Sequence, residues 1–221
     1  FMQRAWRRSV TSSEVDQKMD LFARVRPVSD DTQEAMIEVL ATVLSSPKFL
    51  YLVQDEAPPE KSDHWLNNFE LATRLSTFLW SSTPDKELLD LAKAGKLSDR
   101  AVLISQTNRM LANARAQRFS KHFVRQWLGM QLLDFLDVDK KAHPQFDRDL
   151  KEAMQEEPVA FFQDLLEKNR SVMDFIHADY TMVNERLARH YGLSGVYGNH
   201  FRKVALKPEN RRGGILTQAG L

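Results

Sequence analysis

Apolar residues recur at helical spacing along most of this chain, and short polar segments separate the runs. The pattern is clearest in residues 69–99, where one apolar face ends at Trp80 and a second begins after Pro84. Thr83 is placed to cap the second helix, because its hydroxyl can accept a bond from an unpaired backbone N–H, and proline suits the first helical position. Gly95 is typical of the left-handed residue that ends a helix. The stretch therefore predicts two helices joined by a short turn.

Capping residues predict further helices before this stretch. Thr11 and Glu14 have the spacing of a capping box, in which two side chains bind backbone N–H groups at a helix start. Asp30 or Asp31 is placed to cap the following helix, and Pro47 marks its end. The first part of the chain is therefore predicted to be helical.

A long helix and a shorter one are predicted in the last third of the chain. Residues 147–168 carry a helical pattern, and Pro158 inside it predicts a kink or a break, at a cost of about 3 kcal/mol to an ideal helix. Thr181 is placed to cap a helix over residues 181–191. Residues 195–207 predict a loop or a short strand.

These elements predict an all-α protein, an irregular multi-helix bundle of about nine to ten short helices with little or no sheet. The expected organisation is an N-terminal helical subdomain at 1–54, a linker loop at 55–63, a main helical domain at 64–192, and a loop with the start of a following domain at 193–221. Both ends of the chain fall within patterned sequence, so we expect further segments beyond them.

Composition narrows the classes of function. The chain contains no cysteine, which excludes disulfides, cysteine zinc sites, iron–sulfur clusters and covalently attached haem within it. Lys plus Arg number 31 and Asp plus Glu 30, a balance that argues against nucleic acid as a partner. No apolar run approaches the roughly 20 residues of a membrane-spanning helix, so we expect no transmembrane segment in this chain. The six histidines lack the spacing of a metal site, and no metal is expected.

Acid–base chemistry is the alternative to a purely structural role. Glu156, Asp179, Tyr180 and His190 are the candidate catalytic residues. An enzymatic function would require them to line one deep pocket. The other interpretation is that these residues cap helices and form surface ion pairs.

Three glutamates on the predicted long helix allow the same two interpretations. Glu152, Glu156 and Glu157 are expected to form a solvated acidic face, with the first two on one side of the helix. A glutamate buried among Phe161 and Phe162 would instead have a raised pKa, which would favour acid–base chemistry.

Several motifs resemble those of helical domains of unknown function found in large planctomycete proteins that also carry c-type cytochrome modules. The motifs of the main domain are residues 69–99, 109–111, 114–116, 123–129, 154–157, 169–171 and 179–192. Residues 4–8 and 46–50 resemble the small domain that precedes it, and residues 211–218 resemble the start of the domain that follows. The likeness covers nearly the whole chain.

This resemblance implies a context rather than a reaction. Full-length members are exported, so we expect a periplasmic or cell-envelope location. No cofactor is expected in this chain, and any haem c belongs to domains outside it. The leading hypothesis is a non-catalytic helical scaffold or docking module, whose partners are other domains of the same polypeptide or a cytochrome.

Two further expectations complete this picture. Aromatic residues carry much of the energy of interfaces, and the candidate anchors for neighbouring domains are Trp6, Trp65, Trp80 and Trp127. The alternative function is part of the substrate cleft of a haem-linked oxidoreductase, for which polysaccharide is a candidate substrate.

Overall fold

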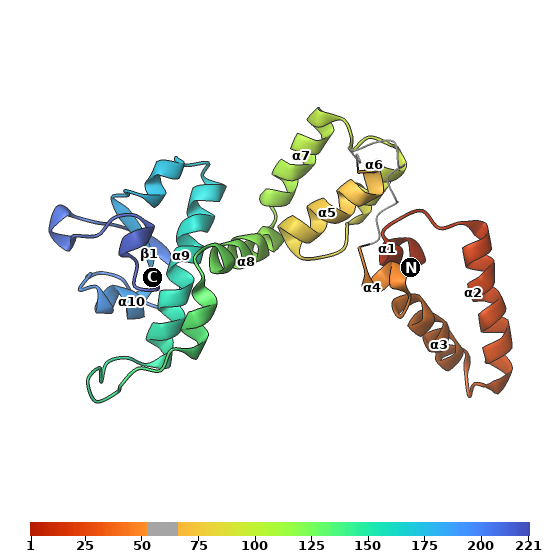
Figure 1. Ribbon diagram of the computed structural model, residues 1–221, viewed down its shortest axis with the longest axis horizontal. Coiled ribbons are helices and arrows are strands. Elements are labelled where there is room, and N and C mark those ends of the chain that lie inside the picture. Colours follow the sequence, from red (N-terminus) through yellow and green to blue (C-terminus); the bar gives the residue numbers. More distant parts are fainter. Residues whose placement is uncertain (53–65) are drawn as a thin grey trace, which may run out of the picture. The chain divides into compact units, whose positions relative to one another are not determined.

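A computed structural model describes residues 1–52 and 66–221 of the chain. These residues form two compact units, Phe1–Met110 and Leu111–Leu221. Helices are the main regular structure of both units, and the described residues contain one sheet of two strands (Figure 1). The predicted all-α, multi-helix architecture is confirmed. Within these two ranges, no helix combines the length and the hydropathy that a membrane crossing requires.

The predicted linker at 55–63 lies outside the described residues, and so does Trp65. The predicted domain boundaries therefore stay a prediction.

The first unit is built from short helices. They are α1 (Met2–Trp6), α2 (Ser12–Val25), α3 (Thr32–Leu44), α4 (Pro47–Leu50), α5 (Asn68–Trp80), α6 (Lys86–Lys93) and α7 (Arg100–Leu111), with a 3-10 turn at Arg26–Val28 after α2. The helices α2 and α3 pack against each other as a hairpin, and α5 packs against α6.

Local capping explains where the first helices begin. Thr11 and Glu14 form the predicted capping box at the start of α2, each binding the other's backbone N–H. Asp31 caps α3, because its carboxylate accepts a hydrogen bond from the backbone N–H of Glu34 at 2.8 Å. Gly95 follows α6 with a φ of 68°, as expected for a residue that ends a helix.

The start of α6 differs from the prediction. Its cap is Asp85, whose carboxylate accepts a hydrogen bond from the backbone N–H of Leu88 at 3.0 Å. Thr83 and Pro84 precede this cap, so the predicted positions are wrong. The Arg109 guanidinium on α7 also binds the Asp85 carboxylate, at 2.8 Å. This contact between two helices fixes the cap, and spacing along the sequence does not reveal it.

The second unit is organised around one long helix, α9 (Arg148–Glu167). The remaining elements are 3-10 turns at Ala114–Ala116, Met130–Phe135 (η3), Val172–Phe175 (η4), Pro208–Asn210 and Ile215–Thr217, the helices α8 (Gln117–Trp127) and α10 (Glu185–His190), and the strands β1 (Tyr180–Val183) and β2 (Arg202–Ala205). The elements α8, α10 and β1 all pack against α9.

The long helix continues through its proline. Asp147 caps α9 by accepting a hydrogen bond from the backbone N–H of Leu150 at 2.7 Å. The helix has no interruption at Pro158, so the predicted break is wrong, while a kink stays a prediction. Val159 and Phe161 are buried directly after the proline. Their packing compensates for the backbone hydrogen bond that proline cannot donate.

The helix predicted over residues 181–191 is a strand followed by a helix. β1 pairs with β2 in antiparallel fashion, with Thr181 opposite Val204. The cap of α10 is Asn184, whose side chain accepts a hydrogen bond from the backbone N–H of the third helical residue at 3.0 Å. Thr181 is therefore a strand residue rather than a cap. The strand β2 lies within the segment where a loop or short strand is expected.

Candidate functional site

A buried carboxylate lies at the centre of the second unit. Glu157 in α9 is 1% exposed, and both of its oxygens accept hydrogen bonds. The Thr181 hydroxyl donates to one oxygen from β1 at 2.6 Å, and the Tyr191 hydroxyl donates to the other at 2.5 Å from just after α10. The expectation of a solvated acidic face is therefore wrong for Glu157.

Burial is the main cause of the pKa shifts of Glu157 and Tyr191. It raises the pKa of the Glu157 carboxyl group, while the two hydroxyl donors and the charge of Arg212 oppose the rise. Burial, and then the neighbouring carboxylate, raises the pKa of Tyr191 well above its usual range. Tyr191 therefore keeps its proton at ordinary pH and remains a donor to Glu157.

The same tyrosine holds the end of the chain, which we call the closing segment (residues 211–221). The backbone N–H of Ala219 donates to the Tyr191 hydroxyl at 2.8 Å. The Arg212 guanidinium lies over the Tyr191 ring, 3.7 Å from its centroid, and donates to the carbonyl of Thr217 at 2.6 Å. Glu157 and Tyr191 thus connect α9, β1, α10 and the closing segment.

Two glycines allow the closing segment to lie against backbone. Gly214 has a φ of 74°, and a Cβ at this position would overlap the carbonyl oxygens of Phe175 and Ile176. A Cβ at Gly220 would overlap the carbonyl oxygen of Met154 in α9. The closing segment is therefore packed as part of the unit, and larger residues do not fit at these points.

Glu156, the neighbour of the buried carboxylate, has a different environment. It lines a polar cavity of about 220 Å³ between α8 and α9, together with Lys121, Arg125, Glu152, Gln155 and Val159. Burial raises the pKa of the Glu156 carboxyl group, and the two cations oppose the rise. This cavity contains none of the other three candidate catalytic residues.

Those three residues lie in separate environments. Asp179 is exposed before β1, and His190 is exposed at the end of α10. Tyr180 is buried, and its ring stacks on Phe161 with a centroid separation of 5.1 Å. Burial raises the pKa of Tyr180 to about 12, so its hydroxyl is a poor base at neutral pH. The deep pocket that an enzymatic function would require from Glu156 and these three is not seen in the described residues, and their catalytic role stays a prediction.

The three described tryptophans have unequal exposure. Trp6 and Trp80 are core residues, whose indole N–H groups donate to the carbonyls of Val43 at 3.2 Å and Met110 at 3.0 Å. The role of these two tryptophans as anchors stays a prediction. Trp127 is 50% exposed, so among the described tryptophans it presents the largest surface to a partner.

Trp127 belongs to a cluster of rings that we call the aromatic patch. Its members are Phe119, Phe123, Trp127, Phe162 and Phe175. The Trp127 ring lies 5.7 Å from that of Phe123 on α8 and 5.3 Å from that of Phe175 in η4. The adjacent turn residues Val172, Met173 and Ile176 are also exposed, so apolar surface continues along η4.

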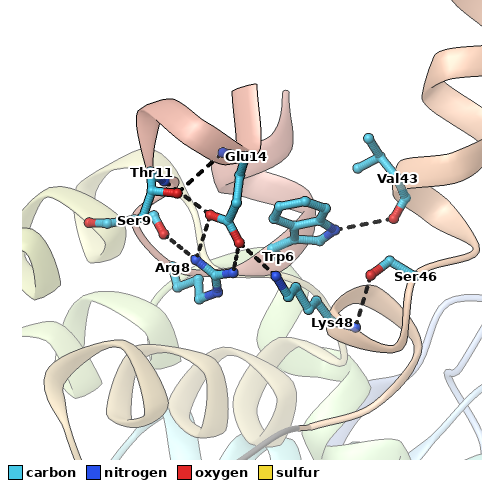
Figure 2. A network of polar contacts seen from close by, with 8 residues as sticks. All are labelled: Trp6, Arg8, Ser9, Thr11, Glu14, Val43, Ser46 and Lys48. Carbon is cyan, nitrogen blue, oxygen red and sulfur yellow. Dashed lines mark hydrogen bonds and ion pairs between the residues drawn. The ribbon is translucent and has the colours of Figure 1, made fainter. Parts of the chain in front are cut away.

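The first unit contains a second polar network, which Figure 2 shows. Glu14, in the first turn of α2, accepts hydrogen bonds from Arg8 at 2.5 Å, from Lys48 at 2.6 Å and from the backbone N–H of Thr11 at 3.0 Å. The two cations hold the pKa of Glu14 well below its usual range. Lys48 also lies over the ring of Trp6, 4.9 Å from its centroid. This network fixes α1, α2 and α4 to one another.

Sequence patterns do not identify the residues that hold the closing segment. Tyr191 is 34 positions from Glu157, and Ala219 is a further 28 positions along the chain. A glutamate followed by proline, close to two phenylalanines, is the available signal for Glu157. Arg212 belongs to the motif at residues 211–218, but nothing in that pattern indicates a contact with Tyr191. Among the described residues, no group of three or more His, Asp or Glu side chains is placed to hold a metal ion.

Comparison with known proteins identifies two family models. PSD4, described as a protein of unknown function (DUF1592), matches residues 66–193, which is more than half of the chain. PSD5, also described as a protein of unknown function (DUF1595), matches residues 1–54. No curated protein and no solved structure matches the chain. The expected likeness to domains of unknown function is confirmed, and the planctomycete and cytochrome context stays a prediction.

Proposed function

The chain belongs to the DUF1592 family of proteins of unknown function, and we propose that it is a non-catalytic helical scaffold that docks neighbouring domains. In this proposal it is part of a larger exported protein of the periplasm or cell envelope that is linked to a c-type cytochrome. Its partners are other domains of the same polypeptide or the cytochrome itself, and haem c is bound outside this chain.

The observation that carries the non-catalytic role is the state of Glu157. A general acid or base must reach the proton that it transfers. Glu157 is buried, and both of its oxygens are bound to hydroxyl groups of the protein. Its contacts hold four segments of the second unit together, which is the work of a structural residue.

The aromatic patch supports the docking role. Folded proteins rarely expose large contiguous apolar surfaces unless these bind a partner. Trp127, Phe123 and the apolar residues of η4 provide such a surface on the second unit. Aromatic rings bury a large area at a small entropic cost, so we assign the main docking contact to Trp127.

The natural full-length polypeptide provides the test. Its visible absorption spectrum and intact mass should show a haem Soret band on a chain much larger than 25.6 kDa. A protein without haem and with a mass close to 25.6 kDa would contradict the cytochrome-linked proposal.

Limited proteolysis of the same full-length protein tests the docking contact. Trp127→Ala should release the neighbouring domain and speed cleavage between domains. Phe135→Ala is the matched control, because this phenylalanine is exposed on η3 and is not part of the aromatic patch. Cleavage of both variants at the wild-type rate would overturn the assignment to Trp127.

A further inference from the structure

The helix α3 is apolar on two sides. Its inner side consists of Ala35, Val39 and Val43, which are buried. On the other side Met36 is 41% exposed, Ile37 is 55% exposed and Leu44 is 40% exposed. A surface helix normally has polar residues on the side that is not buried. The exposed side of α3 therefore lacks the cover that its composition predicts.

These exposed residues form a continuous strip, which we call the outer face of α3. Met36, the half-buried Leu40 and Leu44 follow one another at four-residue spacing, and the exposed Ile37 and Ala41 run beside them. Thirteen residues of helix rise about 20 Å, so the strip is long and narrow. This shape matches a second helix packed along α3 more closely than it matches a compact ligand.

The hairpin that carries this face is strongly acidic. Residues 11–45 contain seven acidic side chains and three basic ones, a net charge of −4. The whole chain is +1, so the rest of it carries +5. Of the seven acids, only Glu14 forms an ion pair with a described residue. Glu34 and Glu38, which belong to α3 itself, are exposed.

The outer face is also held in a fixed position. The Glu14 network ties the start of α2 to α1 and α4 (Figure 2). The Lys18 ammonium group on α2 donates to the Thr42 hydroxyl on α3 at 2.8 Å, which ties the two helices of the hairpin together. A preorganised surface of this kind binds a partner with a smaller loss of entropy.

We propose that the outer face of α3 is a docking site for an amphipathic helix whose apolar stripe is bordered by lysine and arginine. The apolar strip supplies the contact area, and the acidic hairpin supplies charge complementarity. A second copy of the hairpin would bring two charges of −4 together, so the charge disfavours self-association. The outer face of α3 thus adds a second surface to the proposed docking role, separate from the aromatic patch.

Model peptides provide the probes for a binding assay. One fluorescently labelled helical peptide contains only leucine and lysine, and the other has glutamate in place of every lysine. Fluorescence anisotropy of each peptide with the 221-residue chain should show binding of the leucine–lysine peptide alone. Equal binding of both peptides, or binding of neither, would overturn the proposal.

Substitutions then locate the bound peptide. Ile37→Gln should weaken binding at least about tenfold, because it places an amide in the middle of the apolar strip. Ile104→Gln is the matched control, since Ile104 is 50% exposed on α7, and it should bind as the wild type does. Glu38→Gln should weaken binding less and reduce its dependence on salt. An unchanged affinity of Ile37→Gln would overturn the proposal, as would an equal loss in the control.

Two further measurements separate this site from the aromatic patch and from self-association. Trp127→Ala should leave peptide binding to the outer face of α3 unchanged. The proposals for this face and for the aromatic patch can therefore be disproved independently. Sedimentation equilibrium should show a monomer; a dimer that Ile37→Gln dissociates would assign the outer face to a second copy and overturn the proposal. Circular dichroism of Ile37→Gln should match that of the wild type, because the substituted side chain is largely exposed.

Discussion

The two carboxylates Glu14 and Glu157 each connect several segments of their own unit, but their surroundings differ in kind. Glu14 is bound by two cations and a backbone N–H near the surface, and its pKa is lowered. Glu157 is bound by two neutral hydroxyl groups in the interior, and its pKa is raised. Cationic partners thus favour the charged form, whereas burial against neutral donors disfavours it. Both residues connect helices, so a perturbed carboxylate does not by itself indicate catalysis.

The largest expected effect is the loss of the buried carboxylate. Glu157→Ala leaves a cavity and removes the acceptor for Thr181 and Tyr191, so we expect it to lower the free energy of unfolding by about 3 kcal/mol. Urea unfolding of the chain measures this change. Glu152→Ala is the control on the same helix; its side chain is mostly exposed, and the expected change is below about 0.5 kcal/mol. If both substitutions lowered the free energy of unfolding equally, the buried contacts of Glu157 would contribute no more to stability than those of an exposed glutamate.

A smaller effect is expected where the closing segment meets the backbone of the second unit. Gly214→Ala combines a positive φ with an overlap against two carbonyl oxygens, so we expect a loss of about 2 kcal/mol in the free energy of unfolding. Gly195 also has a positive φ, of 81°, but a Cβ there meets nothing within 4 Å. Gly195→Ala should therefore cost about 1 kcal/mol. The difference between the two variants isolates the close packing of the closing segment.

The smallest effects depend on pH and differ in sign between the two carboxylates. The folded-state pKa of Glu14 is depressed, so its ion pairs contribute stability above the unfolded pKa of about 4.3, and this contribution is lost as pH falls through the folded pKa. Glu14→Gln should cost about 1 kcal/mol at pH 7 and progressively less below pH about 4. The folded-state pKa of Glu157 is raised, so its protonation stabilises the fold as pH falls toward the unfolded value. Glu157→Gln should remove that gain.

Urea unfolding at a series of pH values measures both responses. The wild type is the reference at each pH. The stability deficit of Glu157→Gln should grow as pH falls toward about 4, whereas the deficit of Glu14→Gln should stay constant down to pH about 4 and shrink below it. Deficits that change in the same direction over the same pH range would show that the two carboxylates share one kind of environment, contrary to the structure.

Local signals make much of the helical fold predictable from the sequence. The capping box at Thr11 and the cap at Asp31 need only neighbouring residues, and both are predicted. The predicted cap of α6 is wrong, because Arg109 on another helix holds Asp85 in that role. The helix predicted at Thr181 is wrong because a strand of four residues takes its identity from a partner strand about twenty positions away.

The candidate site depends even more on distant contacts. The four candidate catalytic residues are candidates only because their side chains can transfer protons. In the structure they lie in separate environments. The sequence pattern predicts that Glu157 lies on a solvated acidic face. It misses the burial of Glu157 because the residues that cover it, Tyr191 and the closing segment, are distant in the sequence. A pattern along one helix cannot show what covers it, and this also applies to the exposed outer face of α3.

We conclude that Glu157 anchors the second unit through its hydrogen bond to Tyr191. A double-mutant cycle with Glu157→Gln and Tyr191→Phe, read by urea unfolding at pH 7, tests it most directly. We predict a coupling of about 1–3 kcal/mol, because the two side chains are in direct hydrogen-bonded contact. Additive effects with no coupling would show that this contact does not hold the unit together, and would contradict that conclusion.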